Sequence, residues 1–192
     1  MTTPVNDSAF LETDRLRLRR FTDTDADGAL LLELDSDPEV MRYIGPFGLT
    51  SVAAYRERIR TWLLFGEHPE RGVWAVTERA TGAFLGWIFL RDATAHRFAA
   101  EIGWTRASDL ELGYRLRRSA WGCGYATEVA TELVRRALAD PAVTRVVAVA
   151  LVANRGSTRV MEKAGLVYER EVALPGFTDP GAVYVAGRAS LL

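Results

Sequence analysis

The feature that most constrains the fold is a glycine loop between an apolar run and a helical pattern. The loop reads Trp121-Gly122-Cys123-Gly124, and apolar side chains recur at helical spacing from Ala126 onward. A helix start carries N–H groups without partners in the helix and the positive end of the helix dipole. Glycine has no Cβ, so an anion can approach the main chain of the loop closely. The pattern therefore predicts a strand–loop–helix unit with an anion site at the loop.

Two common phosphate loops do not fit this sequence. A nucleoside-triphosphate loop requires GxxxxGK[ST], but the two glycines here are separated by one residue and no lysine follows. A dinucleotide fingerprint requires a third glycine, which is Thr127 here, and an acidic residue about 20 positions later. The next apolar run instead ends at Val152-Ala153-Asn154 without a carboxylate. The loop is thus expected to bind another phosphate compound.

The stretch from Glu111 to Leu166 resembles the GNAT superfamily of acyl-CoA-dependent N-acetyltransferases. The family loop is usually Q/R-x-x-G-x-G/A, and Ser119 to Gly124 occupy that frame with serine in the first position. A second family block, N-x-x-S-x-R-x-x-E-K-x-G-[FL], is matched by Asn154, Ser157, Arg159, Glu162, Lys163, Gly165 and Leu166. The opening run from Leu11 to Arg19 is similar to the start of the ribosomal-protein N-terminal (RimJ/RimL-like) branch. The resemblance covers most of residues 11–192.

Hydrophobic periodicity predicts an α+β fold. Residues 15–19 alternate with period two, which indicates a strand with its leucines inward and its arginines in water. Helices are expected over 22–35, from 51 to Gly66, after the glycine loop and over 155–165; strands are expected over 72–78, 83–90, 110–116, 143–152, 166–172 and 182–189. Residues 91–108 are expected to form a long loop or a short extra strand.

The resemblance implies a GNAT-like mixed, mostly antiparallel central sheet flanked by helices. It places one acetyltransferase domain at 11–192, after a flexible N-terminus at 1–10. A chain of 192 residues is most simply one domain, with a hydrophobic content of 48% that is typical of a globular protein.

Acetyl-CoA is the acyl donor that the resemblance implies. The N–H groups that would bind its pyrophosphate belong to Trp121, Gly122, Cys123, Gly124, Tyr125 and Ala126. Arg117 and Arg118 precede the loop and either face the phosphates or lie on the surface as ordinary arginines. The pantetheine arm is expected to lie along the strand that contains Tyr114 and Leu116, held by main-chain hydrogen bonds.

The reacting groups are expected on two segments. Glu111 is the candidate base that deprotonates the acceptor amine, with Glu101, a water molecule or no base as alternatives. Asn154 either binds the pantetheine amides or only caps the next helix, and Ser157 either donates to the thioester sulfur or serves that helix. The family often places a tyrosine acid seven residues after the asparagine, where this chain has Met161. The acid is then Ser157, water or nothing.

Three functions follow from these expectations. The first is direct acetyl transfer, in a ternary complex, to a protein N-terminal α-amine, which the branch resemblance favours. The second is transfer to a small amine such as an antibiotic or a metabolite. The third belongs to another class, a non-catalytic acyl-CoA-binding module.

Composition limits the partners and the compartment. The net charge of −1 predicts no nucleic-acid or membrane partner, and no apolar run is long enough for a membrane helix. The single cysteine, Cys123, and the lack of a signal-like N-terminus are typical of a cytoplasmic protein. His68 and His96 are isolated in the sequence, so no metal site is expected. A monomer and a homodimer are both compatible with the sequence.

Overall fold

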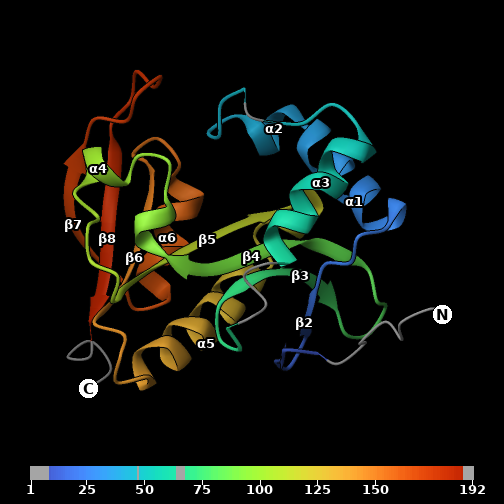
Figure 1. The fold of residues 1–192 in the computed structure, drawn as a ribbon, viewed down its shortest axis with the longest axis horizontal. Coiled ribbons are helices and arrows are strands. Elements are labelled where there is room, and N and C mark those ends of the chain that lie inside the picture. Colours follow the sequence, from blue (N-terminus) through green and yellow to red (C-terminus); the bar gives the residue numbers. More distant parts are fainter. Residues whose placement is uncertain (1–8, 47, 64–67, 188–192) are drawn as a thin grey trace. The chain divides into compact units, whose positions relative to one another are not determined.

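The computed structural model describes residues 9–46, 48–63 and 68–187 (Figure 1). Within these ranges, the chain divides into two compact units. The first unit comprises Met1–Ile88 and Arg115–Tyr125, and the second comprises Phe89–Tyr114 and Ala126–Leu192. A single domain over 11–192 stays a prediction. The expected flexible N-terminus falls mostly outside the described residues.

The strands form one eight-stranded sheet with the order β1-β2-β3-β4-β5-β6-β8-β7. The strands are β1 (Leu11–Glu12), β2 (Leu16–Arg20), β3 (Gly72–Glu78), β4 (Phe84–Asp92), β5 (Asp109–Leu116), β6 (Arg145–Leu151), β7 (Val167–Val172) and β8 (Gly181–Gly187). The β5–β6 pair is parallel, whereas the β1–β2, β2–β3, β6–β8 and β7–β8 pairs are antiparallel. The expected mixed, mostly antiparallel sheet is confirmed.

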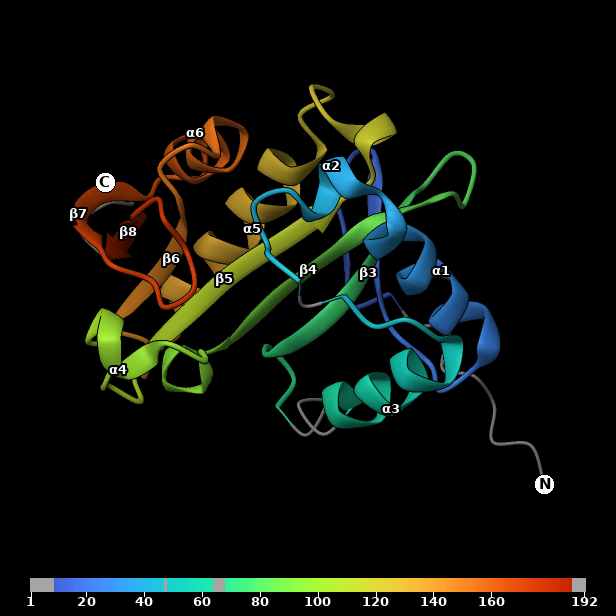
Figure 2. The same ribbon diagram turned by 90° about the horizontal axis from the view of Figure 1, so that it is seen from above.

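The first unit buries the apolar face of β2 and packs two helices together. Leu16 and Leu18 have no exposed surface, as their alternation with arginine predicts. The helices α1 (Asp25–Ser36) and α3 (Val52–Leu63) lie side by side in both ribbon views (Figures 1 and 2). The Thr24 hydroxyl accepts from the N–H of Asp27 and so caps α1. The predicted end of the α3 region at Gly66 lies outside the described residues.

The segment after α1 contains a further short helix. Asp37-Pro38 ends α1, as the proline predicts, but it also begins α2 (Pro38–Met41). The Asp37 carboxylate accepts from the N–H of Glu39, and proline fits the first helical position because it lacks an N–H. This small helix brings Asp37 beside the residues that follow β5.

The second unit holds the parallel strand pair and two helices. Val146, Val147 and Ala148 of β6 are completely buried, in agreement with the continuous apolar run. The helix α5 (Tyr125–Ala139) begins in the first unit with Tyr125 and continues in the second, and α6 (Arg155–Lys163) follows β6. Helices were expected after the glycine loop and over 155–165, and α5 and α6 lie at these positions.

Residues 91–108 differ from the prediction in their secondary structure. This segment forms a 3₁₀ turn at Ala93–Ala95 and a short helix, α4 (Ala99–Ile102), rather than a long loop or a strand. Gly103 ends α4 in the left-handed conformation, with φ of 78°, which glycine adopts without strain. The segment lacked a helical period because its helices are only about one turn long.

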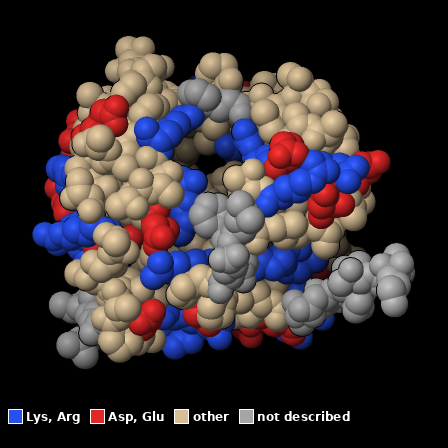
Figure 3. Space-filling view, in the orientation of Figure 1, with Lys and Arg blue, Asp and Glu red and all other residues tan. Residues whose placement is uncertain are grey.

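Charged side chains are mixed over the face shown in Figure 3, as a net charge of −1 leads one to expect. None of the helices in the described ranges is long and apolar enough to cross a membrane.

Candidate active site

The glycine loop forms an open turn between β5 and α5. Gly122 and Gly124 have φ of 73° and 80°, a left-handed backbone that a residue with a Cβ adopts only with strain. Within the described residues, the N–H groups of Gly122, Cys123 and Gly124 donate to no protein acceptor. Together with the first N–H groups of α5, they are backbone donors available to an anion. A pyrophosphate has the charge and the acceptors to occupy such a set.

In this structure one of the expected donors, the N–H of Trp121, has a protein partner. The N–H of Trp121 donates to the carbonyl of Arg118 in a 3₁₀ turn, so this group is already used. The indole N–H of Trp121 donates to the carbonyl of Leu116 at 2.9 Å, which removes that carbonyl from the strand edge expected to bind pantetheine. These bonds help to shape the loop, and the roles of Trp121 and Leu116 in binding the cofactor stay predictions. Cys123 is exposed, and its sulfur lies 3.5 Å from the Trp121 carbonyl.

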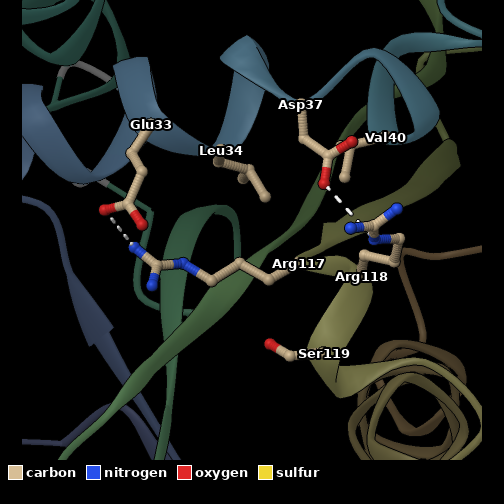
Figure 4. A pocket seen from close by; sticks show the side chains of 7 residues that line it. All are labelled: Glu33, Leu34, Asp37, Val40, Arg117, Arg118 and Ser119. Atoms are coloured by element: carbon tan, nitrogen blue, oxygen red, sulfur yellow. Dashed lines mark hydrogen bonds and ion pairs between the residues drawn. The ribbon is translucent and has the colours of Figure 1, made fainter.

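Arg117 and Arg118 point into a pocket beside the loop (Figure 4). The pocket has a volume of about 530 Å³, and its wall is formed by Glu33, Leu34, Asp37, Val40, Arg117, Arg118 and Ser119. Arg117 pairs with Glu33 at 2.8 Å, and Arg118 lies 3.8 Å from Asp37. The two arginines thus face carboxylates of the α1–α2 region, not the loop N–H groups. Both predicted phosphate-facing side chains have protein partners in this structure.

Arg15 contacts the loop, although its sequence pattern indicated only a solvated strand face. Its Nη1 donates to the carbonyl of Cys123 at 2.9 Å, and its guanidinium lies 4.6 Å from the centre of the Tyr125 ring. The Tyr125 hydroxyl in turn donates to Glu78 at 2.9 Å. No sequence signal links Arg15 to Cys123, because the two residues are 108 positions apart.

Glu111 is a buried carboxylate in the second unit, with only 5% of its surface exposed. Arg91 donates to its Oε2 from Nε at 2.9 Å, and the Arg91 Nη2 lies 2.8 Å from the same oxygen. Burial raises the pKa of Glu111 to about 7, and the attraction of Arg91 only partly opposes this rise. The carboxylate is therefore poised near neutral pH, as a general base should be.

His96 reaches Glu111, which its isolated place in the sequence did not indicate. The His96 Nε2 lies 3.7 Å from the second carboxylate oxygen of Glu111. The His96 Nδ1 accepts from the N–H of Phe98 at 3.0 Å, so a neutral ring carries its proton on Nε2 and faces Glu111 with a donor. Burial, with the nearby charges of Arg91 and Arg97, lowers the pKa of His96 to about 4. Glu101, the alternative base, is exposed on α4.

Asn154, Ser157 and Tyr114 meet where β6 passes into α6. The Asn154 Oδ1 accepts from the N–H of Ser157 at 3.2 Å, so the capping role is present. The Tyr114 hydroxyl donates to the Ser157 carbonyl at 2.8 Å and lies 3.2 Å from the Ser157 hydroxyl. Burial raises the pKa of Tyr114, so this hydroxyl keeps its proton. A tyrosine hydroxyl therefore lies beside Ser157, and it comes from Tyr114 on β5. Met161, which occupies the position of the usual family tyrosine, is buried.

Among residues 9–46, 48–63 and 68–187, no group of three or more His, Cys, Asp or Glu side chains is arranged to hold a metal ion.

Comparison with known proteins places the chain in a family. A family model described as "Acetyltransferase (GNAT) domain" matches residues 15–167. The uncharacterized N-acetyltransferase YoaA of Bacillus subtilis (strain 168) is 32% identical over 83% of each chain. The FsC-acetyl coenzyme A-N(2)-transacetylase of Aspergillus fumigatus is 31% identical over 71% of this chain and 57% of its own length.

Two solved structures show the same fold at low identity. RimL, a ribosomal L7/L12 α-N-protein acetyltransferase in complex with coenzyme A, has a TM-score of 0.72 and 14% identity, covering 95% of this chain and 99% of its own. The aminoglycoside acetyltransferase AAC(6′)-Ib in complex with coenzyme A has a TM-score of 0.67 and 22% identity, covering 92% of this chain and 96% of its own. With the open donor loop before α5 and the family match over most of its length, the chain belongs to the GNAT acetyltransferases and is an acetyl-CoA-dependent N-acetyltransferase.

Proposed function

We propose that the acceptor is the α-amine of a protein or peptide N-terminus. The observation that carries the proposal is the pKa of Glu111, which burial raises to about 7. Such a carboxylate is about half ionised at pH 7 and is a stronger base than an exposed glutamate. This basicity suits an acceptor ammonium that is itself weakly acidic near neutral pH.

The free energy of proton transfer favours an α-amine over a lysine-type amine. An α-ammonium has a pKa of roughly 7.7–8.0, so passing its proton to Glu111 costs only about 1 kcal/mol. A lysine-type ammonium, with a pKa of roughly 10.4, costs about 4–5 kcal/mol in the same transfer. The difference amounts to more than a hundredfold in the population of reactive amine.

Each step of the acetyl transfer is assigned to particular residues. The N–H groups of Gly122, Cys123 and Gly124 bind the pyrophosphate of acetyl-CoA, and Asn154 contacts the pantetheine arm. Glu111 accepts the first proton from the acceptor ammonium, and the free amine then attacks the thioester carbonyl carbon. The nitrogen of the tetrahedral adduct loses its second proton to water as the adduct collapses. The carbon–sulfur bond then breaks, sulfur leaves with the electron pair, and Ser157 stabilises the thiolate with a hydrogen bond. Water supplies the proton that finally makes the thiol.

A small amine is the second candidate, favoured by the pocket beside the loop and by two relatives. The pocket of about 530 Å³ contains two carboxylates, Glu33 and Asp37, which are the groups expected in a site for a cationic amine. The relatives named for FsC transacetylation and for aminoglycoside acetylation act on small molecules by name. Because Arg117 and Arg118 already face these carboxylates, a cationic amine would have to displace an arginine, which makes this candidate the weaker one.

A matched pair of peptides tests the acceptor. One peptide carries a free N-terminus and no lysine, and the other has the same sequence with a blocked N-terminus and one added lysine. We expect thiol release from acetyl-CoA with the first peptide and little with the second at pH 7. A panel of aminoglycosides and polyamines is assayed in parallel. Faster turnover with any of these amines than with the free N-terminus would overturn the α-amine proposal.

A further inference from the structure

Arg15 lies immediately before β2 and reaches the centre of the glycine loop. Its Nη1 donates to the Cys123 carbonyl, and its guanidinium stacks on the ring of Tyr125, the first residue of α5. The other terminal nitrogen, Nη2, lies 3.5 Å from the position that a Cβ on Gly124 would occupy. One arginine thus contacts Cys123 and Tyr125, the residues on either side of Gly124.

The position of Arg15 is itself fixed by neighbouring elements of the first unit. The N–H of Arg79 donates to the Arg15 carbonyl at 2.8 Å, which holds its backbone beside the β3–β4 hairpin. The Tyr125 hydroxyl donates to Glu78, and Glu78 also accepts from the Thr81 hydroxyl at 2.6 Å. The ring beneath the guanidinium is therefore tied to the same hairpin. Arg15 and its support are built from segments that meet only in the folded chain.

The bond to Cys123 determines where the next N–H points. A trans peptide is planar, and its carbonyl and N–H point in opposite directions. No cis peptide bond occurs in the described part of the chain, so the rule applies to the bond between Cys123 and Gly124. Because Arg15 holds the Cys123 carbonyl, the Gly124 N–H is directed away from Arg15, where it has no protein acceptor. The positive charge on the carbonyl side also strengthens this N–H as a donor.

The loop needs such a restraint. Gly122 and Gly124 flank Cys123, and glycine rotates more freely about φ and ψ than any other residue. Without a restraint, the peptide planes between them would sample orientations in which fewer N–H groups converge. The family pattern usually places Gln or Arg at the first loop position, where this chain has Ser119. The shorter side chain of Ser119 weakens one phosphate contact and leaves the backbone donors in place.

We propose that Arg15 is a positioning residue for the phosphate loop, holding the Gly124 N–H in the direction that binds the pyrophosphate of acetyl-CoA. The inference rests on the phosphate site given under the proposed function. It assigns the restraint to a residue outside the loop, immediately before β2. Arg15 acts through the main chain and needs no contact with the reacting atoms.

The test replaces Arg15 and compares two ligands. Arg15→Met keeps an unbranched chain against Tyr125 but removes the donor and the charge. Arg17→Met is the matched control, since Arg17 lies two residues further along, is exposed, and pairs with Glu12. Calorimetric titration measures the Kd of coenzyme A and of pantetheine, which lacks the pyrophosphate. We expect Arg15→Met to raise the Kd of coenzyme A about tenfold and to leave that of pantetheine unchanged, since it weakens one phosphate contact. Arg17→Met should change neither.

Each outcome decides one question. Wild-type affinity for coenzyme A in Arg15→Met would overturn the inference, and so would an equal weakening for both ligands, because a general structural role predicts that result. A wild-type protein that binds pantetheine as tightly as coenzyme A would refute the phosphate site itself. Thermal melts of the variants, which should be close to wild type, show that the comparison is made on folded protein.

Discussion

Replacement of Glu111 by glutamine tests the proposed base directly. The amide keeps the size of the carboxylate but cannot accept the proton of an ammonium ion. The variant can then react only with amine that is already free. At pH 7 about one-tenth of an α-amine with a pKa near 8 is free, whereas about half of Glu111 is ionised in the wild type, so we expect about a fivefold loss of kcat/KM there, rising to about tenfold at lower pH. Above pH 8 most of the amine is free, and the loss should disappear.

The pH dependence of kcat/KM should differ between the wild type and Glu111→Gln. Glu111 has a pKa of about 7, so the wild-type rate should fall below that pH as the carboxylate takes up a proton. The variant should follow the ionisation of the amine alone, at about pH 8, so the gap is widest below pH 7 and closes above pH 8. Thiol release with a peptide acceptor, measured from pH 6 to 9, gives both curves. A loss that is equal at every pH would refute the role of Glu111 as a base.

The stability of the protein provides an independent check on Glu111. Its folded pKa of about 7 lies above the ordinary value of 4.5, so folding favours the protonated form. The contribution of Glu111 to the free energy of unfolding is then greatest below pH 4.5. It falls as the pH rises toward 7, by about 3 kcal/mol. Glu111→Gln should remove this contribution to the pH dependence of Tm. Glu101→Gln is the matched control, since Glu101 is exposed on α4, and it should alter neither profile.

Three further predictions concern the loop and the start of α6. Gly124→Asp should abolish coenzyme A binding in titrations, because it places a carboxylate beside the donors, whereas Gly176→Asp, at another left-handed glycine with free space, should bind normally. Asn154→Ala should raise the KM for acetyl-CoA and Ser157→Ala should lower kcat; if both residues only cap α6, each will cost about 0.5–2 kcal/mol of stability and little activity. Tyr114→Phe should lower kcat and leave little further effect for Ser157→Ala, a non-additivity that independent roles would not give in a double-mutant cycle.

The elements that the sequence predicted well have local causes. Period-two alternation placed β2, an apolar run placed β6, and Asn154 marked the start of α6, since each signal lies within the element that it specifies. The glycine loop belongs to this class, because its left-handed residues are required by a turn only a few residues long. The segment from 91 to 108 is the exception, and its helices are too short to show a period.

The groups that the sequence did not place are held by distant partners. Glu111 could be chosen as a base from its position, but its environment depends on Arg91 from β4 and on His96 from the turn after β4. The fold brings these two side chains to one carboxylate, and no spacing rule in the sequence specifies that meeting. The same holds for the Tyr114 hydroxyl, which reaches Ser157 from 43 positions away. Sequence patterns identify which elements form, whereas the partners of a side chain follow from how those elements pack.

This distinction explains why the arginines were the hardest residues to assign. An exposed arginine next to a loop, such as Arg118, looks the same in sequence whether it binds a phosphate or pairs with a carboxylate on another helix. In this fold Arg117 and Arg118 face Glu33 and Asp37, while Arg15, which has no sequence link to the loop, holds its main chain. Arg15 is itself a cation at the loop, so its proposed role combines the direction that it gives to a backbone donor with the charge that it brings. The proposed phosphate affinity of the loop then depends on Arg15 and not on Arg117 or Arg118, which are its neighbours in sequence.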